Sequence, residues 1–133
     1  MADTMQFDLV SPEKRLASLA AREVRIPGAD GDMTAMPDHA PVITTLRPGI
    51  LTVVGADGAS QSFAVTGGFA EIGTGGASVL AEKAMPAGDV SASVIEALIA
   101  DAQAQAAEAP AEAKDAAEKV VADMQALRGA LGV

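Results

Sequence analysis

The residue types best suited to chemistry gather in one short stretch, residues 31–49, which reads GDMTAMPDHAPVITTLRPG. It contains the single histidine of the chain, His39, together with the carboxylates of Asp32 and Asp38. An imidazole near carboxylates can serve as a general base or as a metal ligand. The stretch also contains three of the seven prolines. A third interpretation is therefore a stiff loop that serves packing or docking.

The sequence lacks the other residues that catalysis or a metal site would need. A histidine base acts on a nucleophile and is itself oriented by a third group, but no Gly-x-Ser-x-Gly or other nucleophile motif is present. Segment 30–38 lacks the full calcium-loop pattern and its distal glutamate. The glycines of segments 28–32 and 73–78 have no following Gly-Lys-Ser/Thr, so we interpret them as turn residues. We expect no catalytic residue, no metal and no cofactor, and a structural or interface role for His39.

The composition excludes further classes of protein. The net charge is −9, which disfavours nucleic acid and anionic lipid as partners, because both are bound through lysine and arginine. The absence of cysteine excludes disulfides, thiolate zinc sites and cysteine nucleophiles. No window approaches the ~18–20 apolar residues of a membrane span, and the N-terminus does not read as a secretory signal. We expect a soluble, intracellular protein with no direct membrane insertion.

Up to about residue 85 the sequence reads as short strands separated by turns. We expect strands at residues 5–10, 22–26, 50–54, 62–66, 69–72 and 77–82. Asp57-Gly58 predicts one hairpin, and the glycine-rich segment 73–76 predicts another. Short strands at this spacing indicate a sandwich or a barrel. Because only three residues are aromatic, the core must be mainly aliphatic.

Beyond residue 86 the pattern becomes helical. Apolar residues of segment 94–102 recur at spacings of three and four, which predicts a first helix. Ser93 fits a capping box with Glu96, and Asp89 and Ser91 are the other candidate N-caps.

A second helix is predicted from about Ala111 to Arg128, ended by Gly129 and Gly132. Pro110 separates it from the first helix. Alanine fills nine of the nineteen positions of segment 101–119, so the hairpin would form readily but bury little area. The sequence leaves open whether this hairpin is mobile or rigidly docked. The predicted fold is α+β, with a β-sandwich in residues 1–86 and an αα-hairpin in residues 87–133.

The proline-rich stretch closely resembles the signature of the epsilon subunit of bacterial F-type ATP synthases. That signature has a glycine-acid turn, a short strand, Pro-x-His-Ala-Pro, an apolar strand and Pro-Gly, followed later by Gly-Gly-x-x-Glu. The matching residues are Gly31, Asp32, Pro37, His39, Ala40, Pro41, Leu46, Pro48, Gly49, Gly67, Gly68 and Glu71. The segments FDLVSPEKRL and ASVLAEKAM also fit, so the resemblance covers essentially the whole chain.

This resemblance implies a sandwich of about ten strands in the central rotor stalk, one copy per complex. In the family, the sandwich binds the gamma subunit and the polar loops of the c-ring, and it couples proton flow to ATP synthesis without catalytic residues. The position is peripheral, on the cytoplasmic face of the bacterial inner membrane. In some members the two helices extend into the alpha/beta catalytic head and block ATP hydrolysis.

The resemblance also implies three groups of interface residues. We expect one group at the c-ring loops, one on the gamma side, and one on the second helix where it would meet a partner. In that order the residues are Gly31, Asp32 and Met33; His39, Ala40 and Pro41; and Val120, Met124 and Leu127. The alternative for His39 is loop packing without a partner contact. We further expect Val42, Ile43 and Leu46 to anchor the loop in the core.

Two departures from the family pattern affect function. Some members bind ATP through Asp-x-x-Arg-Ala at the start of the first helix, but segment 89–98 contains no arginine, so we expect no nucleotide binding. The second helix carries three basic against four acidic side chains, a net charge of −1, whereas inhibition in the family uses basic residues. We expect weak inhibition, with another factor restraining hydrolysis; the competing view is that apolar contacts suffice.

The alternative to a rotor subunit is a protein of another functional class, a free-standing acidic β-sandwich interaction module whose hairpin binds a different partner. A hydrolytic enzyme is a third and weaker interpretation, since it would depend on His39 alone.

Overall fold

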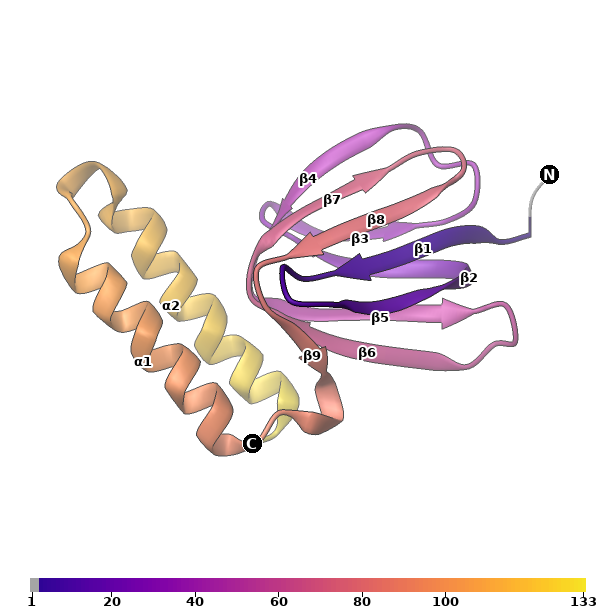
Figure 1. Cartoon of the computed structure of the whole chain (residues 1–133). Coiled ribbons are helices and arrows are strands. Elements are labelled where there is room, and N and C mark those ends of the chain that lie inside the picture. The colour runs from indigo at the N-terminus through magenta and orange to yellow at the C-terminus, as the bar shows by residue number, and fades with distance from the viewer. Residues whose placement is uncertain (1–2) are drawn as a thin grey trace.

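Nine strands and two α-helices make up the part of the chain that the computed structural model describes, residues 3–133 (Figure 1). The strands are β1 (Met5–Val10), β2 (Arg15–Gly28), β3 (Gly31–Ala35), β4 (Val42–Leu46), β5 (Gly49–Gly55), β6 (Ser60–Val65), β7 (Gly68–Ile72), β8 (Gly76–Ala81) and β9 (Ala84–Pro86). The expected sandwich followed by a helical hairpin is confirmed, with nine strands in the described residues where the resemblance implied about ten.

The long strand β2 connects the two layers of the sandwich. In one layer β1, β8, β7 and β4 lie in that order, and in the other β5, β6 and β9 follow one another. β2 pairs with both β1 and β5, and β3 pairs with β2 at its far end. All pairs are antiparallel except β1 with β8. The two predicted hairpins are present as β5–β6 and β7–β8.

The sequence-based prediction for β2 was too short, covering only residues 22–26. A register shift between Ala21 and Glu23 marks a bulge in its pairing with β5. A bulge interrupts the alternation of inward and outward side chains. The alternating pattern used to find strands therefore restarts inside β2, and its first half was missed.

The sandwich core is aliphatic, as expected. Strand alternation buries Phe7 and Leu9 of β1 with Val24 and Ile26 of β2. Phe63 is buried as well, whereas the third aromatic residue, Phe69, is exposed.

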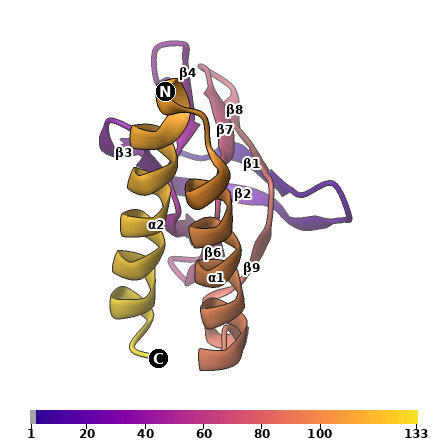
Figure 2. The same ribbon diagram turned by 90° about the vertical axis from the view of Figure 1, so that its left-hand side faces the viewer.

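The two helices are α1 (Ala92–Glu108) and α2 (Ala111–Leu131), which run side by side against one flank of the sandwich (Figure 2). A short 3₁₀ turn, Ala87–Asp89, leads into α1. Ser91 is the N-cap of α1, because its hydroxyl accepts from the Val94 amide at 3.3 Å. The prediction of a capping box at Ser93 was therefore wrong, and Ser91, one of the alternative N-caps, is confirmed.

The predicted end of α2 at Arg128 was three residues too early, whereas Gly132, one of the two glycines expected to end the helix, does so. The helix continues through Gly129 and stops at Gly132, whose φ of 74° lies in the left-handed region. The Gly132 amide donates to the carbonyls of Arg128 and Gly129. Gly129 stays helical because a single helical glycine costs only about 1 kcal/mol relative to alanine.

A second, smaller apolar cluster joins the hairpin to the sandwich. Ile95 and Ile99 of α1 and Met124 and Leu127 of α2 are buried in it, together with Ala64 of β6. Ile50 of β5 and Met85 of β9 are partly buried and pack against it. The cluster is separate from the sandwich core, and it is what places α2 beside the turns described next.

Candidate functional site

Strands β2 and β3 form a hairpin with a tight turn, and the residues expected at the c-ring, Gly31, Asp32 and Met33, begin β3 directly after that turn. Gly28 pairs with Gly31, so only Ala29 and Asp30 form the turn. A Cβ on Gly28 would lie 2.6 Å from the Gly31 carbonyl oxygen, and Gly31 has a φ of +144°. Both positions therefore favour glycine for a structural reason.

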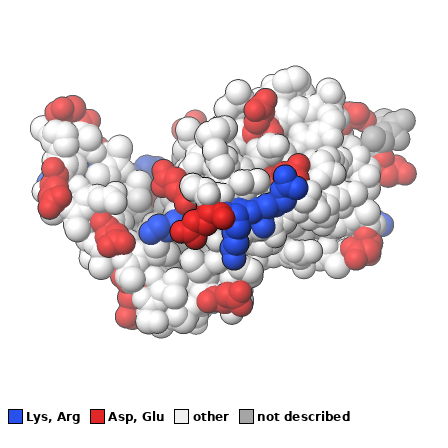
Figure 3. Space-filling view, in the orientation of Figure 1, with Lys and Arg blue, Asp and Glu red and all other residues white. Residues whose placement is uncertain are grey.

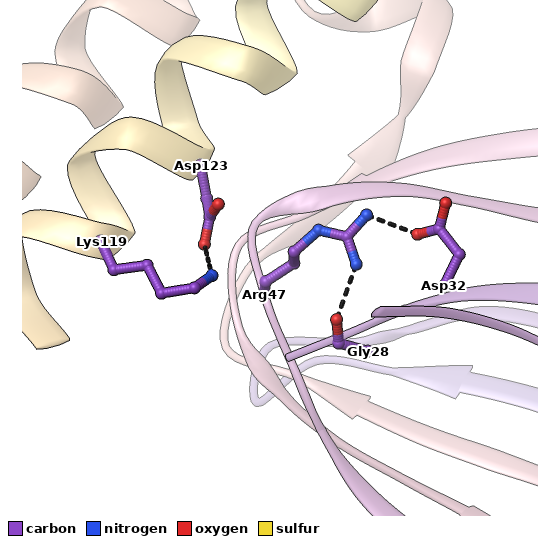
Figure 4. A network of polar contacts seen from close by, with 5 residues as sticks. All are labelled: Gly28, Asp32, Arg47, Lys119 and Asp123. Atoms are coloured by element: carbon purple, nitrogen blue, oxygen red, sulfur yellow. Dashed lines mark hydrogen bonds and ion pairs between the residues drawn. The ribbon is translucent and has the colours of Figure 1, made fainter. Parts of the chain in front are cut away.

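Arg47, on the turn between β4 and β5, fastens this hairpin from the side (Figure 4). Its Nη1 donates to the Gly28 carbonyl at 2.6 Å, and its Nη2 forms an ion pair with Asp32. The Arg47 side chain is only 27% exposed, whereas Asp32 is 79% exposed. The carboxylate is thus presented to solvent while its partner is held against the sandwich.

The β3–β4 loop, which carries His39, is fixed by local contacts. The His39 amide donates to the Met36 carbonyl at 3.2 Å, and Nδ1 lies 2.6 Å from the Ala40 carbonyl. Because a carbonyl only accepts, Nδ1 carries the proton in this contact. Asp38 has a φ of 63°, which aspartate tolerates better than most residues. His39 is half-buried and Ala40 and Pro41 are exposed.

The prediction that Ile43 anchors this region was wrong. Ile43 is 69% exposed, whereas Leu46 is buried and Val42 packs against the core from its edge. β4 has the two-residue period of a strand, so Ile43 must face the opposite way from Val42 and Leu46. The apolar character of Val42-Ile43 hid this alternation in the sequence.

Ile43 is part of an exposed apolar face that sequence reasoning missed. Phe69 of β7 pairs with Leu80 of β8, and both side chains are more than two-fifths exposed. Ile43 lies on the same layer, opposite Glu71 of β7. We call Ile43, Phe69 and Leu80 the outer apolar face. Alternation within β7 and β8 was a signal that could have identified it.

One of the residues expected on the gamma side, Pro41, lies near the outer apolar face. A hollow of about 430 Å³ beside it is lined by Pro41, Glu71 and Ser78, among others. The structure therefore brings the end of the β3–β4 loop and this layer of the sandwich together.

A groove of about 510 Å³ separates α2 from the turns of the sandwich. Asp30, Arg47 and Glu82 line it on the sandwich side, and Lys119 and Asp123 line it on α2. Lys119 donates to Asp123 at 2.6 Å (Figure 4). Figure 3 shows the basic side chains of this face gathered at the junction of helices and sandwich, in contact with carboxylates. The groove therefore carries two cations and three carboxylates and is not positive overall.

The residues expected as the partner face of α2 are not all accessible. Met124 and Leu127 are buried in the cluster that joins the hairpin to the sandwich, and only Val120 is exposed. A partner could reach Met124 and Leu127 only if α2 left this position.

Within residues 3–133, the structure holds no group of three or more histidine, aspartate or glutamate side chains arranged for a metal ion. Neither described helix is both long and apolar enough to span a membrane.

Comparison with known proteins gives consistent results. Residues 4–87 match the family model described as ATP synthase, Delta/Epsilon chain, beta-sandwich domain. The chain is 58% identical to the ATP synthase epsilon chain of Fuscovulum blasticum over 132 residues, which are 99% of each chain. It is 58% identical to that of Rhodobacter capsulatus over 127 residues, 96% of each chain.

Among solved structures, the fold is similar to a chain of the Euglena gracilis mitochondrial ATP synthase, OSCP/F1/c-ring in rotational state 1. The TM-score is 0.75 at 20% identity, covering 98% of this chain and 83% of that one. At this identity the similarity establishes the fold.

Proposed function

The chain belongs to the epsilon chain family of ATP synthases, and from this premise we propose that it is a non-catalytic subunit of the central stalk of a proton-translocating F-type ATP synthase. It couples rotation of the c-ring to ATP synthesis and acts on the cytoplasmic face of the bacterial inner membrane, bound to the complex rather than inserted in the bilayer. The observation that carries the proposal is identity over almost the whole length of named epsilon chains.

The outer apolar face supports contact with the gamma subunit. Ile43, Phe69 and Leu80 are large apolar side chains that the isolated chain leaves in water. Contiguous exposed apolar surface commonly marks a protein interface. Pro41 lines the hollow beside this layer, and with His39 and Ala40 of the same loop it completes the gamma side of the proposal.

The β2–β3 turn supports contact with the c-ring loops. Gly31 and Asp32 are exposed and Met33 is half-buried, so the turn can be reached by a partner. Its fastening by Arg47 gives it the stiffness that a torque-carrying contact needs.

The test is proton-driven ATP synthesis in membranes that are stripped of epsilon and reassembled with the full chain. We expect Asp32→Lys to lower synthesis while the variant still folds, because a reversed charge opposes the contact at the turn. Glu13→Lys is the matched control, since it reverses an exposed carboxylate on the β1–β2 turn. Equal synthesis with both variants would contradict the c-ring assignment. Failure of the unmodified chain to bind gamma would favour a free-standing interaction module.

We propose that the hairpin inhibits hydrolysis weakly. Met124 and Leu127 are buried, which leaves little apolar surface on α2 for a partner. Arg128 is engaged by Glu96 and Lys119 by Asp123, so α2 also offers few unpaired cations to an acidic partner surface. ATP hydrolysis by the catalytic head should change little when the full chain is added. Strong suppression would show that apolar contacts of a released α2 outweigh its unfavourable charge.

We also propose that the chain binds no nucleotide in the hollow between α1, α2 and the sandwich, which is distinct from the groove described above. The charged residues that line this hollow are Glu82, Asp101 and one cation, Lys83. Two carboxylates disfavour a triphosphate there. Calorimetry with ATP and the full chain should show no binding.

A further inference from the structure

The β2–β3 turn has little stiffness of its own. Asp30, Gly31 and Asp32 are exposed, and no proline lies between Gly28 and Ala35. Glycine at both ends of the turn gives its backbone more freedom than other residues would. Its shape must therefore be maintained by contacts from outside the hairpin.

Those contacts come from the neighbouring β4–β5 turn and centre on Arg47. The Arg47 amide donates to the Pro27 carbonyl at 3.0 Å, and the Ala29 amide donates to the Thr45 carbonyl at 2.8 Å. The guanidinium then adds the bond to Gly28 and the ion pair with Asp32. One side chain thus contacts the backbone before the turn and the carboxylate after it.

Arginine is suited to this arrangement and lysine is not. The guanidinium is planar and presents several N–H groups in a fixed fork, whereas an ammonium is a point charge. Two acceptors in different directions, a carbonyl and a carboxylate, match the fork. Because the Arg47 side chain is largely covered by its surroundings, the directions in which the guanidinium can point are restricted.

We infer that Arg47 is a positioning residue, which holds the β2–β3 turn and the Asp32 carboxylate in the orientation in which they meet the c-ring loops. The contact with the c-ring loops rests on the proposed function, whereas the positioning of the turn and of the Asp32 carboxylate by Arg47 concerns the isolated chain. Asp32 uses Oδ1 for Arg47, and within the described residues no hydrogen bond engages Oδ2. One carboxylate oxygen is thereby kept for a donor on the partner.

The first measurement is amide hydrogen exchange in the full chain. In Arg47→Ala we expect exchange at Ala29 to rise by about tenfold, since a charge-assisted bond that closes the turn is lost. Exchange at Gly58, in the distant β5–β6 turn, should not change. Arg25→Ala is the matched control on the same hairpin, because Arg25 forms an exposed ion pair with Glu23 of β2 and, within the described residues, no side-chain hydrogen bond to the turn.

The second measurement is proton-driven ATP synthesis by complexes reassembled with each variant. We expect synthesis to fall with Arg47→Ala, to fall less with Arg47→Lys, and to stay unchanged with Arg25→Ala. The melting temperatures of the three variants should be similar. If Arg47→Ala fails to fold, Arg47→Lys and Asp32→Asn carry both measurements.

Unchanged exchange at Ala29 would overturn the inference whatever the function of the chain. Faster exchange at Ala29 with full ATP synthesis would instead refute the c-ring role of the turn, and so the proposed function at this site. Faster exchange with lower synthesis, at an unchanged melting temperature, supports both.

Discussion

Arg128 near the end of α2 donates through Nη2 to the Glu96 carboxylate of α1 at 2.9 Å. The same guanidinium donates through Nε to the Val133 carbonyl at 3.0 Å. Arg128 therefore joins the start of α1, the end of α2 and the C-terminus, at the end of the hairpin where no loop connects the helices.

This ion pair is expected to contribute little stability. Both side chains are more than a third exposed, so water and salt screen the attraction. A double-mutant cycle with Arg128→Ala and Glu96→Ala, followed by urea unfolding, should give a coupling of about 0.2–1 kcal/mol. The Lys119–Asp123 pair within α2 is the control. A coupling well above that range would make the pair a main support of the hairpin.

Truncation of the buried cluster should matter far more. Ile95 is fully buried, so Ile95→Ala should cost about 2–5 kcal/mol in free energy of unfolding. Val120→Ala, at a position of α2 that is 38% exposed, should stay within about 0.5 kcal/mol. Circular dichroism at 222 nm during urea unfolding measures both. Equal costs would mean that the hairpin is not docked through Ile95.

The N-cap of α1 gives a sharper test of local structure. Ser91→Ala should lower stability by about 1 kcal/mol, because the Val94 amide loses its acceptor. Ser93→Ala should cost clearly less, since within residues 3–133 the Ser93 hydroxyl is hydrogen-bonded to that of Ser91 alone. Thermal unfolding of the two variants compares them directly. The reverse order would restore the capping box of Ser93 and Glu96.

The outer apolar face should be dispensable for folding and necessary for binding gamma. Phe69→Glu places a charge where an apolar partner surface is proposed, so affinity for gamma should fall by about tenfold or more. Gln61→Glu adds the same charge at an exposed position of β6 and should have no effect. Titration of each full-length variant with gamma measures the affinity. Unimpaired binding by a folded Phe69→Glu would move the gamma contact elsewhere.

The sequence by itself determined the features that depend on local patterns. Turn glycines and short apolar runs predicted the hairpins, and the spacing of Ile95 and Ile99 predicted the buried face of α1. Net charge and the missing cysteines excluded whole classes of function. The proline-rich loop and its neighbours carried the resemblance to epsilon chains, because that signature consists of turn residues that stand in a fixed order along the chain.

Only the tertiary structure decided which of the predicted residues are accessible. Ile43 and Phe69 look like core residues in the sequence, but strand pairing turns them outward, while packing against Ala64 buries Met124 and Leu127. The sequence did not reveal that Arg47 fastens the β2–β3 turn either, since Arg47 lies 15 positions from Asp32 along the chain. Local propensity sets the turns and helices, whereas burial and such distant contacts arise only when separate segments meet.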